Sequence, residues 1–274
     1  EGLLQAFPRA KWHQYDPLTR DTVKEGSRLA FGEVLEAQYH FAKAAVIVAL
    51  DADFLYTHPM RLRYTRQFTN GRRISSGQRA FNRLYVAESS PTVAGTMAEH
   101  RLALGSGEVE HLARYLAAEL GALSREPGLE LPPVQSAWAA GLVEDLRRHR
   151  GASLVIAGRW QPPVVHALAH LLNQALGNVG KTLHYTASAE ARPVNQMASL
   201  AQLVGEMKAG QVELLLILGG NPVFNAPADL GIAEQLAKVK QSVHLGLTLD
   251  ETAELCTWHI PQTHYLESWG DARA

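Results

Sequence analysis

The sequence predicts an α/β fold in which parallel β-sheets are flanked by helices. Three observations carry this prediction. The chain contains short apolar runs of strand length, longer amphipathic patterns separate these runs, and hydrophobic residues make up 46% of the 274 positions against 19% charged. A chain of this size and balance can bury a substantial core. Alternation of strands with helices is typical of βαβ units, which form parallel sheets through right-handed crossovers.

Five apolar, β-branched runs are predicted to be strands. Most of them are apolar at every position, which is typical of parallel strands that are buried on both faces. The runs are Ala45–Leu50, Leu84–Ala87, Leu154–Ala157, Leu214–Leu218 and Val243–Leu247.

Five further stretches have apolar residues at helical spacing, with polar residues opposite, and are predicted to be amphipathic helices. In the first of them, Val109, Leu112 and Leu116 share one stripe. The five stretches are Glu108–Leu120, Trp138–Leu146, Val164–Leu176, Met197–Met207 and Leu230–Val239.

One segment is typical of a linker between two Rossmann-like lobes. Ser124–Val134 combines three prolines with a glycine and has neither a helical nor a strand period. We therefore predict a first α/β lobe at 1–125, a linker at 126–134 and a second α/β lobe at 135–274.

An internal similarity supports two lobes. Val46–Pro59 aligns without a gap on Leu214–Pro227, and each segment consists of a predicted strand, a tight loop, an aromatic residue and a proline. A weaker similarity relates Thr92–Leu102 to Thr252–Pro261, and each of these segments follows the next predicted strand of its lobe. Two unrelated βα units can share such features, so duplication and chance both stay open. Either way, both loops are expected at carboxyl ends of strands, where open α/β sheets bind ligands.

Charge and cysteine content exclude several classes of function. Twenty-six Lys+Arg against 27 Asp+Glu give a formal net charge of -1, which lacks the electrostatic footprint of a nucleic-acid-binding protein. Cys256 is the only cysteine, so the chain cannot form an intrachain disulfide, a Cys₄ zinc site or a Cys₄ iron–sulfur cluster. No apolar run approaches the roughly 20 residues that span a bilayer, so we expect no direct membrane insertion. The start at Glu1 and the end at Ala274 are consistent with a piece of a longer protein.

Two pairs of side chains could hold a metal. Asp51 and Asp53 follow a predicted strand, where paired carboxylates can bind magnesium or attack a phosphoryl group, but capping of the following loop is the favoured interpretation. His166 and His170 stand at helical i,i+4 spacing, without the glutamate of a zinc protease between them. We expect these four residues not to share a metal, because no third ligand converges with either pair.

The remaining candidate is the segment Gly219, Gly220, Asn221 and Pro222, called here the GGNP turn. The chain has no G-x-S-x-G nucleophile elbow, no P-loop and no dinucleotide fingerprint. In the GGNP turn, glycines allow close approach of a ligand to the backbone, and asparagine offers a donor and an acceptor. The turn is therefore suited to the edge of a nucleotide or a pterin.

Here the sequence resembles the molybdopterin oxidoreductase family. Leu214–Leu230 (LLLILGGNPVFNAPADL) and Asp250–Asp271 (DETAELCTWHIPQTHYLESWGD) are similar to family segments that line the pterin-dinucleotide site. Leu154–Tyr185 resembles the middle domains of that family. The resemblance implies the α/β architecture predicted above and covers most of the chain.

The departures from the family pattern point to one branch. Cys256–Pro261 (CTWHIP) has larger groups where active members have alanine-aspartate-apolar, and Asp51–Phe54 (DADF) replaces the glycine and asparagine-proline of the equivalent loop. With Asp51–Pro59, Asn82–Ser89 and Glu267–Arg273, the chain resembles the molybdopterin-like iron–sulfur subunit of alternative complex III, a quinol-oxidising respiratory complex.

This resemblance implies a scaffold domain that has lost its cofactor. It implies no independent catalysis and no cofactor in this chain, a vestigial and empty GGNP turn, and iron–sulfur clusters in a downstream half of the subunit. The implied partners are that half and the other subunits of a complex on the periplasmic side of the cytoplasmic membrane. The alternative is a pterin-dinucleotide-binding fragment of an active molybdenum oxidoreductase. For the scaffold, we expect Asn221 to bond protein backbone and Trp258 to be largely buried in the former cofactor pocket.

Overall fold

The computed structural model describes residues 2–73, 81–190 and 192–270. The chain divides into two compact units. The central unit is Thr22–Ala191, and the split unit combines Glu1–Asp21 with Arg192–Ala274. The predicted linker at 126–134 does not separate these units. It is the loop before α6 inside the central unit, and the strand that follows it pairs in the same sheet as the strands that precede it.

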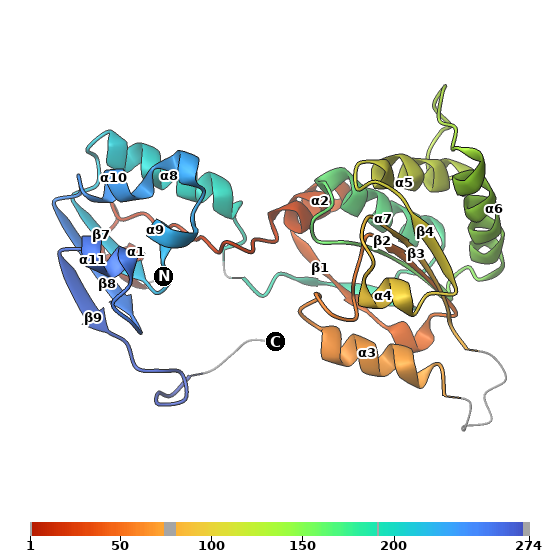
Figure 1. Cartoon of the computed structure of the whole chain (residues 1–274), viewed down its shortest axis with the longest axis horizontal. Coiled ribbons are helices and arrows are strands. Elements are labelled where there is room, and N and C mark those ends of the chain that lie inside the picture. The colour runs from red at the N-terminus through yellow and green to blue at the C-terminus, as the bar shows by residue number, and fades with distance from the viewer. Residues whose placement is uncertain (1, 74–80, 191, 271–274) are drawn as a thin grey trace. The chain divides into compact units, whose positions relative to one another are not determined.

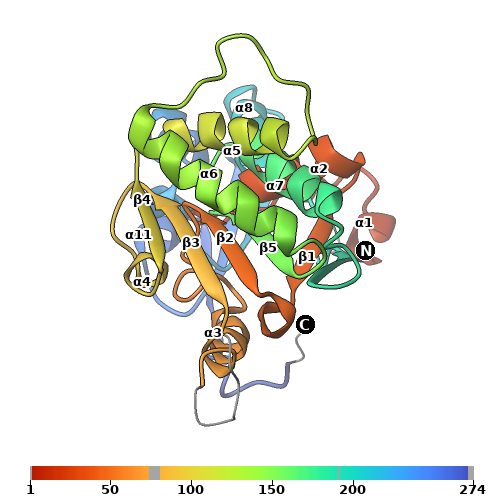
Figure 2. The same ribbon diagram turned by 90° about the vertical axis from the view of Figure 1, so that its right-hand side faces the viewer.

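The central unit contains a parallel sheet of order β4-β3-β2-β5. Helices α5, α6 and α7 pack on one face of this sheet, and α3 and α4 pack on the other (Figure 2). The strands are β2 Val46–Leu50, β3 Arg83–Glu88, β4 His100–Ala103 and β5 Ser153–Ala157, and the helices are α3 Arg61–Asn70, α4 Val93–Thr96, α5 Glu108–Glu119, α6 Pro133–Arg148 and α7 Pro163–Ala175.

Two further strands form an antiparallel pair in the central unit. β1 (Leu35–Tyr39) pairs with β6 (Leu183–Ala187), and α2 (Asp21–Phe31) precedes β1. The short 3₁₀ helix η1 (Phe41–Lys43) leads into β2 and buries Phe41 against Phe54 and Tyr64. This aromatic cluster is part of the core below the sheet.

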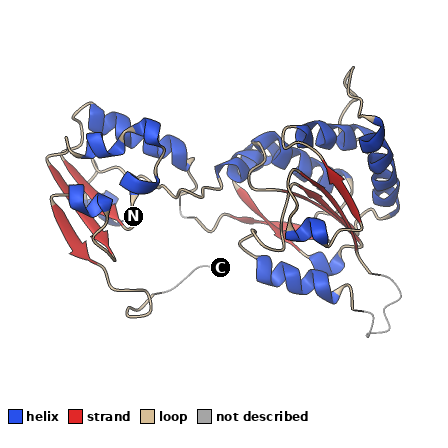
Figure 3. Ribbon diagram, viewed as in Figure 1, coloured by secondary structure: helices blue, strands red, loops and turns tan. Residues whose placement is uncertain are grey.

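The split unit contains a three-stranded parallel sheet of order β7-β8-β9. Helices α8 and α10 form its core with one face of the sheet (Figure 1). The remaining helices of this unit are short, as Figure 3 shows. The elements are α1 Gly2–Ala6, α8 Gln196–Lys208, β7 Leu214–Leu218, α9 Pro222–Asn225, η3 Ala228–Leu230, α10 Ile232–Leu236, β8 Gln241–Gly246, α11 Glu251–Leu255 and β9 Trp258–Pro261.

The predicted α/β class is confirmed, since all five apolar runs are parallel strands flanked by helices. One detail is wrong. β7 was expected to be buried on both faces, yet Leu214, Leu216 and Leu218 are 53%, 47% and 61% exposed. The sequence pattern predicted burial because the run is apolar throughout, but no helix core includes these three side chains.

The two parallel sheets share one arrangement. Val46 pairs with Arg83 as Leu214 pairs with Gln241, and both sheets continue in the same register to their third strand. The loops match as well, because the N–H of residue 51 donates to the carbonyl of 87 at 2.7 Å and the N–H of 219 donates to that of 245 at 2.8 Å. Such detailed agreement favours duplication of one fold unit over chance.

The structure shifts the weaker similarity by a few positions. Thr92 accepts a hydrogen bond from the N–H of Gly95 as helix N-cap, and Asp250, not Thr252, accepts the same bond from the N–H of Ala253. Because the N-cap is a threonine in one unit and an aspartate in the other, comparison of residue types alone does not reveal that the two positions are equivalent.

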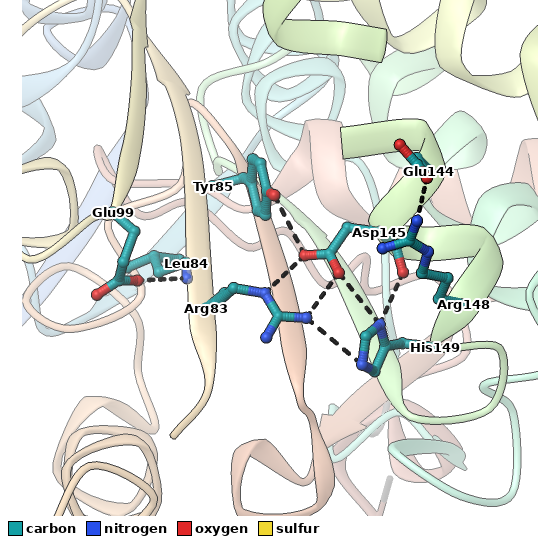
Figure 4. Close-up of polar contacts among 8 residues, drawn as sticks. All are labelled: Arg83, Leu84, Tyr85, Glu99, Glu144, Asp145, Arg148 and His149. Carbon is teal, nitrogen blue, oxygen red and sulfur yellow. Dashed lines mark hydrogen bonds and ion pairs between the residues drawn. The ribbon is translucent and has the colours of Figure 1, made fainter. Parts of the chain in front are cut away.

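A polar cluster attaches α6 to β3 (Figure 4). Asp145 accepts hydrogen bonds from Arg83 Nε at 2.7 Å and Arg83 Nη2 at 2.6 Å, and from the Tyr85 hydroxyl at 3.1 Å. Burial and the nearby Asp145 carboxylate raise the pKa of Tyr85 to about 12. The cluster lies toward the amino end of β3, away from the strand-end loops, so we assign it a structural role.

Within residues 2–73, 81–190 and 192–270, no helix combines the length and the apolar character needed to cross a membrane.

Candidate functional site

The GGNP turn lies directly after β7, at the carboxyl end of the strand. Gly219 and Gly220 both have left-handed backbones, with φ of 74° and 77°, which side chains with a Cβ rarely adopt. Apart from the glycine and its two neighbours in the chain, no heavy atom of the described residues lies within 4 Å of the position that a Cβ would take at either glycine. The backbone conformation therefore favours glycine at both positions, and the space beside them is open.

Asn221 ends the turn and is bonded by the protein itself. Its Oδ1 accepts from the Thr252 hydroxyl at 2.7 Å and from the N–H of Phe224 at 3.4 Å. Its Nδ2 donates to Glu251 Oε2 at 2.6 Å, and this hydrogen bond lowers the pKa of Glu251. The expected backbone bond is confirmed at Phe224, but the shorter bonds go to two side chains of α11.

Two buried groups complete this arrangement. The Thr252 hydroxyl, besides donating to Asn221, accepts from the N–H of Val223 at 3.1 Å. His244 Nε2 lies 3.0 Å from the carbonyl oxygen of Gly220, and because a carbonyl can only accept, this nitrogen is the donor. His244 was not predicted as a site residue, since its only signal in the sequence is a histidine inside an apolar strand.

The equivalent loop of the central unit follows β2. Asp51 occupies the position of Gly219 and is the only non-glycine residue with positive φ, 53°, in the described part of the chain. Its carboxylate accepts from the N–H of Ser89 at 3.0 Å and from Gln161 Nε2 at 2.8 Å. Asp53, at the position of Asn221, accepts from the N–H of Ala94 at 3.2 Å. The sequence favoured capping of the loop that follows β2, whereas these bonds link the two aspartates to segments that follow β3 and β5.

Gln161 marks the point where the strand order of the central sheet reverses. β2 has β3 on one side and β5 on the other, and open α/β sheets bind ligands at such a switch point. Gln161 is fully buried, and its Nε2 also donates to the Ser106 hydroxyl at 3.0 Å. Its Oε1 has no hydrogen-bond partner within the described residues.

The candidate metal ligands do not come together. His166 and His170 are both buried on α7, and His170 Nδ1 lies 3.1 Å from the Tyr185 hydroxyl. Asp51 and Asp53 bond in different directions, as described above. Across the described ranges, no group of three or more His, Cys, Asp or Glu could hold a metal ion.

Trp258 does not fill a pocket. The expectation that it is largely buried is wrong, since the side chain is 67% exposed. Trp258 is the first residue of β9, at the edge of the three-stranded sheet, and it lies on the same face as the exposed leucines of β7. Its bulk therefore says nothing about the space beside the GGNP turn.

Comparison with known proteins gives a fold. No family model matches the chain, and no curated protein matches it. Acetylene hydratase from Pelobacter acetylenicus has a similar structure, with a TM-score of 0.59, 12% sequence identity, and coverage of 91% of this chain and 45% of that chain. The chain has a molybdopterin-oxidoreductase-like fold. It spans less than half the length of the hydratase chain.

A second similar structure is the formyltransferase/hydrolase complex (FhcABCD) from Methylorubrum extorquens in complex with methylofuran. Its TM-score is 0.49 at 15% identity, covering 90% of this chain and 70% of that chain.

Proposed function

We propose that this chain is a non-catalytic scaffold domain of an electron-transfer subunit in a quinol-oxidising respiratory complex. Its fold is that of a molybdopterin oxidoreductase, and its sequence resembles the iron–sulfur subunit of alternative complex III. In this proposal the chain holds the cluster-bearing half of the subunit and neighbouring subunits in place, on the periplasmic side of the membrane. It binds neither pterin nor metal.

The observation that supports this proposal is the chemistry of the two strand-end loops. In the central unit, Asp51 and Asp53 stand where the duplicated loop has Gly219 and Asn221. A pterin dinucleotide carries a pyrophosphate, and carboxylates at the strand ends repel such an anion. In the split unit, both polar ends of the Asn221 amide are bonded by α11. The loops are thus explained as parts of the fold.

The test is made on the complete subunit, purified from its own cells. We expect neither molybdenum nor tungsten, and no fluorescent oxidised pterin on acid treatment, in amounts near that of the protein. The Asn221→Ala variant should reduce the amount of assembled complex but leave quinol oxidation per assembled complex unchanged. Lys240→Ala, at an exposed position, is the control that should change neither.

The alternative is a pterin-dinucleotide-binding fragment of an active molybdenum oxidoreductase. Two observations favour it: the open space beside the left-handed Gly219 and Gly220, and the buried Gln161 Oε1 without a described partner. Pterin released in near-equal amount to protein, together with loss of turnover per complex in Asn221→Ala, would establish the alternative and exclude the scaffold.

A further inference from the structure

The sheet of the split unit has one uncovered apolar face. In the parallel register, alternate residues of β7, β8 and β9 point to the same side. On one side, the residues of the two outer strands are apolar and 47% to 67% exposed. Gln241, Val243 and Leu245 of β8 lie between them. We call this surface the leucine face; its exposed members are Leu214, Leu216, Leu218, Trp258 and Ile260.

Such a surface is unusual for a parallel sheet, because helices normally cover both faces. Contiguous apolar patches on this scale mark binding surfaces. The opposite face of the same sheet is covered, since Leu215 of β7 packs in one core with Leu200 and Val204 of α8 and Ile232 of α10. The sheet of the split unit is therefore uncovered on one face only, among the described residues.

The duplicated sheet of the central unit indicates what covers this face. Val46, Val48 and Leu50 occupy the positions of Leu214, Leu216 and Leu218, and all three are fully buried. They lie in one core with the apolar stripes of α5 and α6. These two helices follow β4 directly in the chain.

Crossover handedness explains why the two sheets differ. From β2 to β4 and from β7 to β9 the strand order runs in one direction. Right-handed crossovers therefore place the connecting helices on the equivalent face of each sheet, α3 and α4 in the central unit and α9 and α10 in the split unit. In the central unit the order then reverses, because β5 lies on the far side of β2. The connection that makes this reversal, through α5 and α6, covers the other face together with α7, which follows β5. The described part of the split unit contains no such reversal after β9.

We infer that the leucine face is the docking surface for two amphipathic helices of the same polypeptide that lie after β9, equivalent to α5 and α6. Each docking helix is expected to present an aliphatic stripe to the leucine face, as α5 does to its own sheet with the fully buried Val109, Leu112 and Leu116. This inference concerns the fold of the split unit and does not depend on the proposed function.

Thiol accessibility tests the inference. Leu216→Cys is introduced on a Cys256→Ser background, both in the 274-residue chain and in the complete gene product. Ala201→Cys, on the exposed side of α8, is the matched control. We expect both thiols to react within a few-fold of each other in the 274-residue chain. In the complete product, labelling of Leu216→Cys should slow at least ten-fold while Ala201→Cys keeps its rate.

Three outcomes would overturn the inference. Equal labelling of Leu216→Cys in both proteins would mean that nothing in the polypeptide covers the face. Protection already in the 274-residue chain would assign the face to a second copy or to the chain itself. Protection that appears only when other subunits are added would assign it to a partner. Ile260→Cys, on the other outer strand, repeats the measurement in case Leu216→Cys does not fold.

Discussion

Asp51 offers a direct test of how the strand-end loop of the central unit is stabilised. Its backbone is left-handed, which costs an L-residue on the order of 1–2 kcal/mol relative to glycine. Against this cost stand the hydrogen bonds that its carboxylate accepts from Ser89 and from the buried Gln161. Hydrogen bonds to a charged group contribute about 1.5–3 kcal/mol each, and partial exposure places these near the lower end.

Together, the hydrogen bonds and the backbone strain predict the order of stability of three variants. Asp51→Ala loses the bonds and keeps the strain, so we expect it to lose about 3 kcal/mol of unfolding free energy. Asp51→Gly loses the same bonds but relieves the strain, so it should be about 1 kcal/mol more stable than the alanine variant. Gly219→Ala, at the equivalent left-handed position without side-chain bonds, is the control and should cost only the strain.

Urea unfolding followed by circular dichroism measures these differences, with the denaturant slope checked for constancy. If Asp51→Gly is as stable as the parent chain, the carboxylate bonds do not exceed the strain, and the reasoning fails. If the alanine and glycine variants are equally stable, the left-handed conformation is not a cost at this position.

Three further predictions concern the central unit. Burial alone would raise the pKa of Asp145, but the hydrogen bonds and charge of Arg83 outweigh it and hold that pKa low. Asp145→Asn should therefore cost about 2 kcal/mol at pH 7, and the cost should fade as pH falls through the lowered pKa, whereas a pH-independent difference would contradict this. Burial lowers the pKa of His170 from 6.5 to about 4. The contribution of the neutral imidazole to the free energy of unfolding should therefore be full above pH 6.5 and decrease by roughly 3 kcal/mol as pH falls toward 4. In unfolding measured as a function of pH, His170→Phe should flatten this slope. A Cβ at Gly158 would lie 1.8 Å from a backbone carbonyl oxygen, so Gly158→Ala should unfold several °C lower, unlike Gly107→Ala, which has open space.

The buried strands were predicted well from the sequence, because a strand that is buried on both faces is a short run of apolar residues. β2 is apolar at every position and lies between β3 and β5 in the sheet. Four strands that carry polar residues and lie at edges or in a two-stranded pair were not predicted, namely β1, β4, β6 and β9. β-propensity at an edge depends on neighbours that a single sequence does not reveal.

The domain boundary illustrates another limit. Prolines and a glycine at 124–134 mark an interruption between helices, and local composition cannot distinguish this from a boundary between units. The actual division lies near Asp21 and Ala191, where the chain passes between the units twice. A split unit depends on contacts between residues 1–21 and 192–274, such as the Tyr15 hydroxyl donating to the Asn225 carbonyl at 2.8 Å. Contacts at this sequence separation leave no local pattern.

The sequence predicted where the two candidate loops lie but not which residues bond to them. The GGNP turn and the Asp51 loop both lie at carboxyl ends of strands, as expected from the order of strand and loop. The partners Thr252, His244 and Gln161 come from other elements and could not be assigned from spacing.

Because the two sheets are equivalent position by position, the two strand-end loops can be compared directly. The same backbone hydrogen bond, from residue 51 to 87 and from 219 to 245, supports an aspartate in one copy and a glycine in the other. A glycine at this position leaves the space beside the turn open, whereas the aspartate fills it with a charge bonded to Ser89 and Gln161. Because the two loops share this hydrogen bond and a positive φ, their difference at this position is one of side chain, a charged carboxylate in one unit and a glycine in the other. In the proposed scaffold role, the Asp51 carboxylate repels an anion from the central strand end, and α11 already bonds both polar ends of the Asn221 amide at the other.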